Sequence, residues 1–201
     1  LALDGEAGAA VARLVQRLDG MPLAIELAAA RVEALGVGQM LERLDDQLLT
    51  SANRAAPARQ RSLEAAVDWS YQLLTKPEQR VFRYLSVFPG PFGLDAAEAV
   101  AGTDAGPAVL HLVDCSLLTP PATGPDGRSR YSMLQTLRGY GLRQLEQAGE
   151  EPAAAAALAA HALSTAERAV VQLARSDQEL SAARWLDAED ATVHQGLAWA
   201  L

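Results

Sequence analysis

The sequence predicts a mainly α-helical protein: a small helical bundle, a winged-helix domain with a short β-hairpin, and a repeat-like helical segment at the C-terminal end. Alanine and leucine, both strong helix formers, account for 41 and 31 of the 201 residues. Apolar residues recur at three- and four-residue spacing along most of the chain. One stretch rich in Pro, Gly and Asp lies between two short apolar runs, a pattern typical of a hairpin.

Residues 1–50 are expected to form the helical bundle. An apolar face from Val11 to Leu18 indicates the first helix, and Gly20 follows where helices commonly end. Pro22 suits the first turn of the second helix, because a first-turn residue needs no N–H partner. This helix should stop near Gly36–Gly38, and apolar residues at 40–48 indicate a third. Short connections of this kind are typical of a bundle.

Residues 51–61 are predicted to be a linker or exposed loop. This stretch is basic, contains Pro57 and shows no apolar periodicity. Ser62 is expected to cap the helix that follows.

Residues 62–149 are expected to form the winged-helix domain. Lys76-Pro77-Glu78 indicates the start of a helix, and shorter helices are expected over residues 94–101 and 107–115. The apolar runs at 117–119 and 131–134 predict the hairpin, and a last helix should end at Gly149.

Residues 150–201 are expected to begin a helical sensor or repeat region. The spacing predicts one long helix through Leu158–Leu173 and two shorter ones, near 180–186 and 193–200. The first residue is not Met, and both ends fall close to predicted helices, so we expect a fragment of a longer protein.

Charge and cysteine content exclude several classes of protein. A single cysteine cannot form an internal disulfide, which favours a reducing compartment, and we expect a cytoplasmic protein. No apolar run approaches the roughly 20 residues that span a bilayer, so no membrane partner is expected. The net charge of −8 argues against a domain whose whole surface binds nucleic acid.

No catalytic or metal site is expected. His111, His161 and His194 lie on separate predicted helices without a second ligand at zinc-binding spacing, so we interpret them as ordinary surface or helix histidines. Cys115 lies among apolar residues and is expected to be buried. The single lysine, Lys76, has no glycine-rich loop before it, so the chain lacks a Walker A motif and is not expected to be an enzyme.

The helix expected within residues 107–116 has two possible roles. It could bind DNA directly as part of the winged helix, or it could pack inside the protein. The segment 107–116, which would enter the major groove, contains no Arg or Lys, and the wing offers Arg128 and Arg130. Arginine is the commonest base-reading side chain, and phosphate contacts supply most non-specific affinity. We therefore expect a packed helix rather than a DNA-reading one.

The motif LDGMPLAIELAAARV, residues 18–32, resembles the GLPL motif of NB-ARC-type signalling ATPases of the STAND class. The phrases RQRSLEAAVDWSYQLL, FRYLSVFPGPFGLDAAEAV and RYSMLQTLRGYGLRQLEQAGE follow it in order. Together they resemble the bacterial branch of that class, found in LuxR-type and SARP-type transcriptional regulators. The resemblance covers essentially the whole chain.

The resemblance implies a regulatory segment of a transcription factor that ATP and ADP switch. The nucleotide would be held in the parent protein by an N-terminal P-loop domain, and no cofactor is expected in the chain alone. The resemblance places Gly20, Pro22 and Leu23 near the adenine. The MHD motif of that class corresponds to Leu134 and Gln135 here: Leu134 has no phosphate donor and is expected in the core, and Gln135 is the remaining candidate.

The resemblance also implies partners. These are the P-loop domain and a DNA-binding effector domain of the same protein, with homo-oligomer formation on activation. The alternative function is that of a DNA-binding winged-helix domain in its own right.

Overall fold

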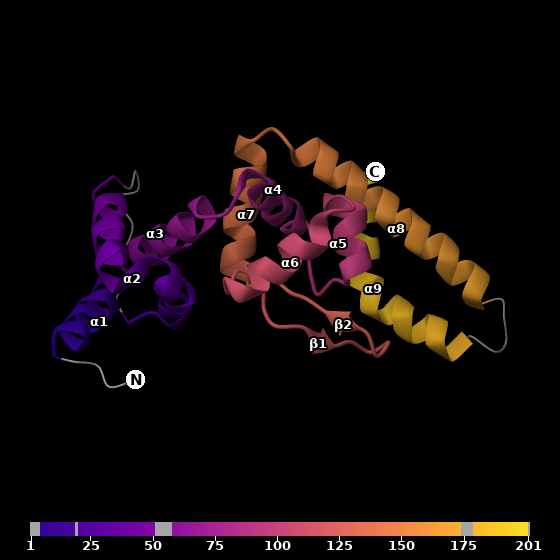
Figure 1. Ribbon diagram of the computed structural model, residues 1–201. Helices are drawn as coiled ribbons and strands as arrows, with labels where there is room; N and C mark the ends of the chain where they lie inside the picture. The colour runs from indigo at the N-terminus through magenta and orange to yellow at the C-terminus, as the bar shows by residue number, and fades with distance from the viewer. Residues whose placement is uncertain (1–4, 19, 51–57, 174–178, 201) are drawn as a thin grey trace. The chain divides into compact units, whose positions relative to one another are not determined.

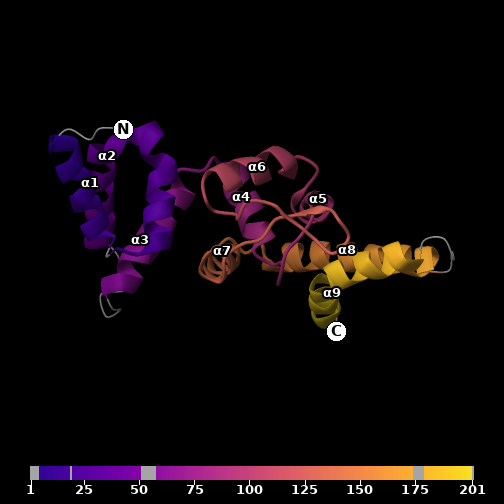
Figure 2. The same cartoon turned by 90° about the horizontal axis from the view of Figure 1, so that it is seen from below.

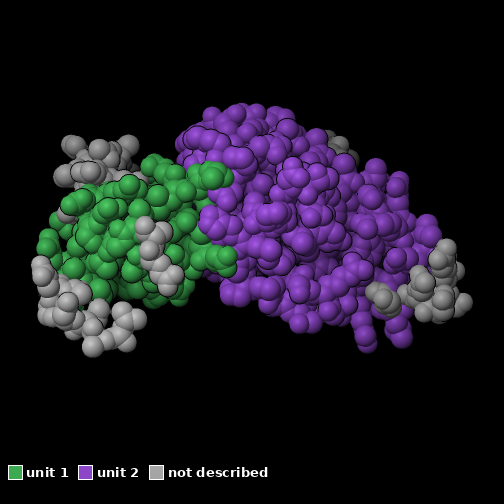
Figure 3. All heavy atoms as spheres, viewed as in Figure 1, with its two compact units in different colours: residues 1–75, 114–116 green, residues 76–113, 117–201 purple. Residues whose placement is uncertain are grey.

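A computed structural model describes residues 5–18, 20–50, 58–173 and 179–200 (Figure 1). The expected fold class is confirmed: the described chain is mainly helical, with one small antiparallel pair of strands. It divides into two compact units, residues 1–75 with 114–116 and residues 76–113 with 117–201 (Figure 3).

The first unit is a helical bundle whose core lies between three helices. Their bounds are α1 Gly5–Arg17, α2 Pro22–Thr50 and α3 Ala58–Gln72. Gly36 interrupts α2 with a non-helical, left-handed φ of 71°, so two helical segments meet there, as the glycines at 36 and 38 predicted. The core is made of small and branched apolar side chains with one tryptophan: Leu14, Leu18, Ala24, Ala28, Met40, Leu41, Leu44, Ala65, Ala66 and Trp69.

Helix α3 begins earlier than the sequence indicated. Residues 58–61 belong to it, so the interpretation of these four residues as linker is wrong, and Ser62 lies inside the helix rather than at its cap. The rest of the expected linker, residues 51–57, lies outside the described residues. Tertiary packing of the following apolar face, with Ala65, Ala66 and Trp69 buried, stabilises a helix that its first turn alone would not specify.

The second unit contains the element order of a winged helix. Phe92 and Tyr131 form an isolated antiparallel bridge, with both backbone N–H···O distances 2.9 Å. This bridge joins the segment before the second helix to the far arm of the hairpin, as the first and third strands of a winged helix do. The elements are α4 Lys76–Leu85, α5 Leu94–Ala101, α6 Ala105–Asp114, β1 Ala122–Thr123, β2 Ser129–Arg130 and α7 Gln135–Gln147.

Aromatic and leucine side chains fill the core of this winged helix. Phe88 and Phe92 stack with ring centroids 4.6 Å apart, and Phe92 is completely buried under the hairpin bridge. Burial of such rings contributes about 1.5–3 kcal/mol each. The largest fully buried side chains here are Phe82, Leu85, Phe92, Leu112, Leu117, Leu118, Leu137 and Leu145.

Two long helices complete the second unit. Helices α8, Glu151–Leu173, and α9, Glu179–Ala200, pack side by side (Figures 1 and 2). The two short helices expected near 180–186 and 193–200 are wrong, because α9 continues through both ranges. Gly196 permits close approach, since a Cβ there would lie 2.6 Å from Ala162 Cβ. None of the described helices combines the length and apolar character needed to cross a membrane.

Candidate functional site

The turn between α1 and α2 carries three of the residues expected near a nucleotide. Gly20 adopts a left-handed φ of 65°, and its amide donates to the carbonyl of Val15 at 3.0 Å. Pro22 is the first residue of α2 and is exposed, and Leu23 is half-buried. The three residues are therefore adjacent at one helix start, which is the position that proline favours in any helix.

Gln135, the fourth expected site residue, begins α7 in the other unit and is exposed. Leu134 precedes it with its side chain 43% exposed, so the expectation that Leu134 lies in the core is wrong. Tyr131, three residues earlier, is buried. No side chain caps the start of α7, whose amides are oriented toward the two exposed residues.

Helix α6 occupies the position of a winged-helix recognition helix and is apolar. Its inward face is buried through residues 105, 106, 108, 109 and 112. Its outward face presents Pro107, Leu110 and Asp114, and Leu110 is 55% exposed. Nδ1 of half-exposed His111 lies 2.6 Å from Oε1 of Glu78 on α4. This outward face therefore offers no Arg or Lys to a phosphate, in agreement with the sequence.

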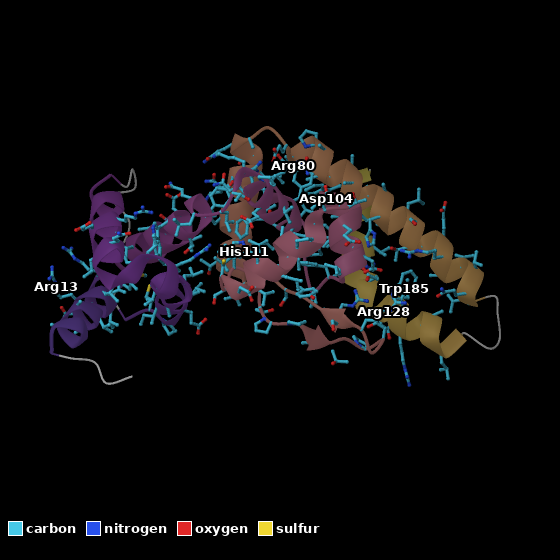
Figure 4. The ribbon with its side chains drawn as sticks, in the orientation of Figure 1. Arg13, Arg80, Asp104, His111, Arg128 and Trp185 are labelled. Atoms are coloured by element: carbon cyan, nitrogen blue, oxygen red, sulfur yellow. The ribbon has the colours of Figure 1, made fainter. Side chains whose placement is uncertain are left out.

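The hairpin is short, with Ala122 opposite Arg130 and Thr123 opposite Ser129. Gly127 closes its turn with a φ of 76°. Arg128 lies in the hairpin (Figure 4). Its side chain is 64% exposed, and its guanidinium lies 3.8 Å from the Asp95 carboxylate of α5. The strands pair closer to the turn than the apolar runs that predicted them.

Arg130, the second arginine of the hairpin, is buried in a cluster of charged side chains. Its side chain is 5% exposed; Nη2 donates to Oδ2 of Asp126 at 2.7 Å, and Nη1 donates to Oε1 of Glu189 on α9. The other oxygen of Glu189 lies 3.9 Å from Nε2 of His161 on α8. All four side chains are at most 5% exposed. We call these four residues the hairpin cluster; it joins the wing to both long helices.

The charges of the hairpin cluster stabilise one another. Burial raises the pKa of Asp126, but hydrogen bonds from the Arg130 side chain and from the Arg128 amide outweigh this effect and hold the pKa below its ordinary value. Burial lowers the pKa of Arg130, and the hydrogen bonds and charges of Asp126 and Glu189 raise it above its ordinary value. Breaking one member of a buried ion pair typically costs about 3–5 kcal/mol.

Sequence reasoning treated Arg130 as a wing cation and did not single out Glu189. A signal for Glu189 was present: it falls on a stripe of α9 at helical spacing whose other members are buried, namely Ala182, Trp185, Thr192 and Gly196. A carboxylate on such a face requires a buried partner. His161, interpreted as an ordinary histidine, is likewise buried in the cluster.

The remaining candidates show no catalytic arrangement. Cys115 is buried, as its apolar surroundings predicted. His194 is exposed and lies 3.2 Å from the Asp190 carboxylate on the same helix. Among the described residues, no three His, Cys, Asp or Glu side chains gather closely enough to hold a metal ion.

An open cavity of about 440 Å³ lies between α5 and α8. Its floor consists of alanine methyl groups, and its polar lining is Asp95, His161, Ser164 and Arg168. His161 thus belongs to both the cavity and the hairpin cluster.

The chain is similar to mycobacterial proteins. Over 150 residues it is 47% identical to a Mycobacterium tuberculosis protein named as an HTH-type transcriptional regulator, and a Mycobacterium bovis protein with the same kind of name matches equally. These matches cover 71% of this chain and 17% of each relative. An uncharacterized M. tuberculosis protein is 36% identical over 169 residues, which cover 80% of this chain and 42% of that protein. The chain thus spans less than half the length of these relatives.

No protein-family profile matches the chain. No solved structure matches it either.

Proposed function

We propose that this chain is a regulatory segment of a transcriptional regulator. The observation that carries the proposal is the 47% identity, over 150 residues, to a relative named as an HTH-type transcriptional regulator. The helix and hairpin order of the second unit is consistent with that name, because winged helices are a common variant of the helix-turn-helix. A transcriptional regulator works where the DNA is, so we propose a cytoplasmic location.

One candidate mechanism is direct DNA binding by the winged helix. The name of the relative favours this candidate, and the exposed Arg128 of the hairpin supplies one cation to a phosphate. The apolar outward face of α6 weighs against base readout by that helix. DNA contact through the wing is the form of this candidate that the side chains support best.

The second candidate mechanism is a nucleotide-controlled switch of the STAND class. Here a P-loop domain elsewhere in the parent protein would hold ATP or ADP, and the α1–α2 turn with Gly20, Pro22 and Leu23 would pack near the adenine. Gln135 at the start of α7 would face the phosphates. Exchange of nucleotide would shift the packing of both units on that domain, expose surfaces for homo-oligomer formation and pass the signal to a DNA-binding effector domain. The apolar, cation-free face of α6 favours this candidate.

A DNA titration separates the two candidates. Fluorescence anisotropy of a labelled 20-base-pair random duplex is measured against this chain at about 50 mM and about 200 mM salt, where phosphate contacts change affinity steeply. Direct binding predicts saturation with an affinity that falls as salt rises. A titration that is flat at both salt concentrations would count against DNA contact by the parent chain and favour the switch. An Arg128→Gln variant is the control, since it removes the exposed wing cation and leaves the contact between Arg130 and Glu189 unchanged.

A further inference from the structure

We propose that α9 is an inhibitory clamp on the hairpin: Glu189 holds Arg130 in the hairpin cluster and so withholds the second wing cation from DNA. This inference rests on the DNA-binding candidate above and adds its regulation. Arginine side chains commonly contact DNA phosphates, and the hairpin carries two arginines, Arg128 and Arg130. Here one of the two is 5% exposed and paired with two carboxylates.

The clamp originates in a long-range contact. Arg130 and Glu189 are 59 residues apart, and the strand that carries Arg130 has only two residues. A ladder this short holds a hairpin weakly, so its position depends on the Phe92–Tyr131 bridge and on side-chain contacts. The Arg130–Glu189 pair is therefore a main tether between the wing and α9.

Local charge also acts against phosphate binding while the clamp is closed. Arg128 and Arg130 face Asp95, Asp126 and Glu189, so carboxylates outnumber the wing arginines. Withdrawal of α9 would remove Glu189 and free Nη1 of Arg130, while Nη2 stays paired with Asp126 of the hairpin. The two arginines of the hairpin would then face two carboxylates, Asp95 and Asp126, and the side chain of Asp95 is more than half exposed.

The hydrogen bonding of the hairpin cluster is incomplete, which makes the cluster easier to open. Within the described part of the chain, Nε of Arg130, Oε2 of Glu189 and Nε2 of His161 are buried without a hydrogen-bond partner. Unsatisfied buried polar atoms reduce the net stability of an ion-pair network. His161 also lines the open cavity between α5 and α8, so the cluster has a polar face near the surface.

The test compares Glu189→Gln with Asp187→Asn, which removes the same charge from an exposed position on the same helix. Glu189→Asp, which keeps the charge but shortens the reach, is the second variant. Two measurements are made on the full chain: hydrogen exchange of residues 122–131 without DNA, and anisotropy with the 20-base-pair duplex at about 50 mM salt.

We expect Glu189→Gln to speed hairpin exchange and to tighten DNA binding about tenfold, the effect of one added charged hydrogen bond. In both measurements, the exchange rate of the hairpin and the affinity for DNA, Glu189→Asp should lie between Glu189→Gln and the parent chain. Asp187→Asn should match the parent chain in both. Adding Arg130→Gln to Glu189→Gln should abolish the gain in binding. Unchanged hairpin exchange in both Glu189 variants would overturn the clamp. Hydrogen exchange of the hairpin could become faster in the Glu189 variants while no variant binds DNA. That result would support the tether between Arg130 and Glu189 but reject the DNA-binding candidate, and with it the inhibition of DNA binding by α9.

Discussion

Gly141 of α7 lies directly against Ser86, which follows the end of α4. A Cβ at Gly141 would lie 2.7 Å from Cβ of Ser86 and 3.3 Å from Cε1 of Phe82. Arg138, one turn earlier in α7, donates from Nε to the Ser86 carbonyl at 3.0 Å. The close approach of these two helices, and with it the packing of the winged-helix core, therefore depends on the missing side chain.

We predict that Gly141→Ala destabilises the chain by about 1–3 kcal/mol, because the added methyl group overpacks the contact with Ser86. Gly139→Ala is the matched control two residues away, where a Cβ would meet only Nη1 of Arg143 at 3.9 Å. That change should stabilise the helix by up to about 1 kcal/mol. Urea unfolding followed by circular dichroism measures both, and equal effects of the two substitutions would contradict the packing argument.

Acid should release the hairpin. The pKa of Asp126 is lowered in the folded chain, so its ionised form stabilises the fold above the ordinary pKa of an aspartate, and this stabilisation is lost as pH falls through the lowered value. We expect hydrogen exchange in residues 122–131 to rise, after correction for intrinsic rates, as pH falls below about 4. Asp126→Asn should show raised exchange already at pH 7 and a flatter acid response. Glu167→Gln, at an exposed position of α8, should behave as the parent chain does.

The ion pair between Arg83 and Glu150 should require arginine. Nε and Nη2 of Arg83 each donate to one oxygen of Glu150 at 2.8 Å, in the two-pronged geometry that a lysine cannot reproduce. Arg83→Lys should lower the free energy of unfolding by about 1 kcal/mol. The loss should be smaller at high salt, because both side chains are partly exposed. Arg184→Lys, at an exposed position on α9, should change stability by less than about 0.5 kcal/mol. Thermal unfolding at low and high salt measures the difference; equal losses would indicate that the fork geometry contributes nothing.

The chain alone should not bind ADP. The sequence has one lysine, and it lies outside any glycine-rich loop, so the cradle that grips the phosphates of a P-loop protein is missing. Isothermal calorimetry with ADP and Mg²⁺ should give only the heat of dilution. A saturable one-to-one isotherm would contradict this prediction, and Pro22→Ala and Gln135→Ala would then locate the site.

Local signals predicted the helices well where glycine or proline marks their ends. Gly93 and Gly102 flank α5, and its predicted bounds, 94–101, match the structure. Helix α9 lacked such markers between its two expected halves: the apolar spacing predicted two short helices, yet residues 187–192 occupy exposed and buried positions of one continuous helix. Polar residues within a helix do not by themselves end it, because only the packing partner determines which face is buried.

The candidate sites were harder to predict because they depend on distant partners. The lack of Arg and Lys on α6 is a property of ten consecutive residues, so it is evident from the sequence itself. The burial of Arg130 depends on Glu189, which lies 59 residues later, and no spacing rule links the two. Leu134 was expected in the core because its side chain is apolar, but it lies just before α7 and is 43% exposed.

The pairing of Arg130 with Glu189 has a consequence for how related sequences diverge. A lineage that replaces Glu189 alone leaves Arg130 with Asp126 as its single carboxylate partner, and one that replaces Arg130 alone leaves Glu189 buried without its arginine, so each single change costs stability. Positions 130 and 189 should consequently vary together, as charged pairs or as apolar pairs. An alignment of homologues in which the two positions drift independently would show that natural selection does not act on this contact.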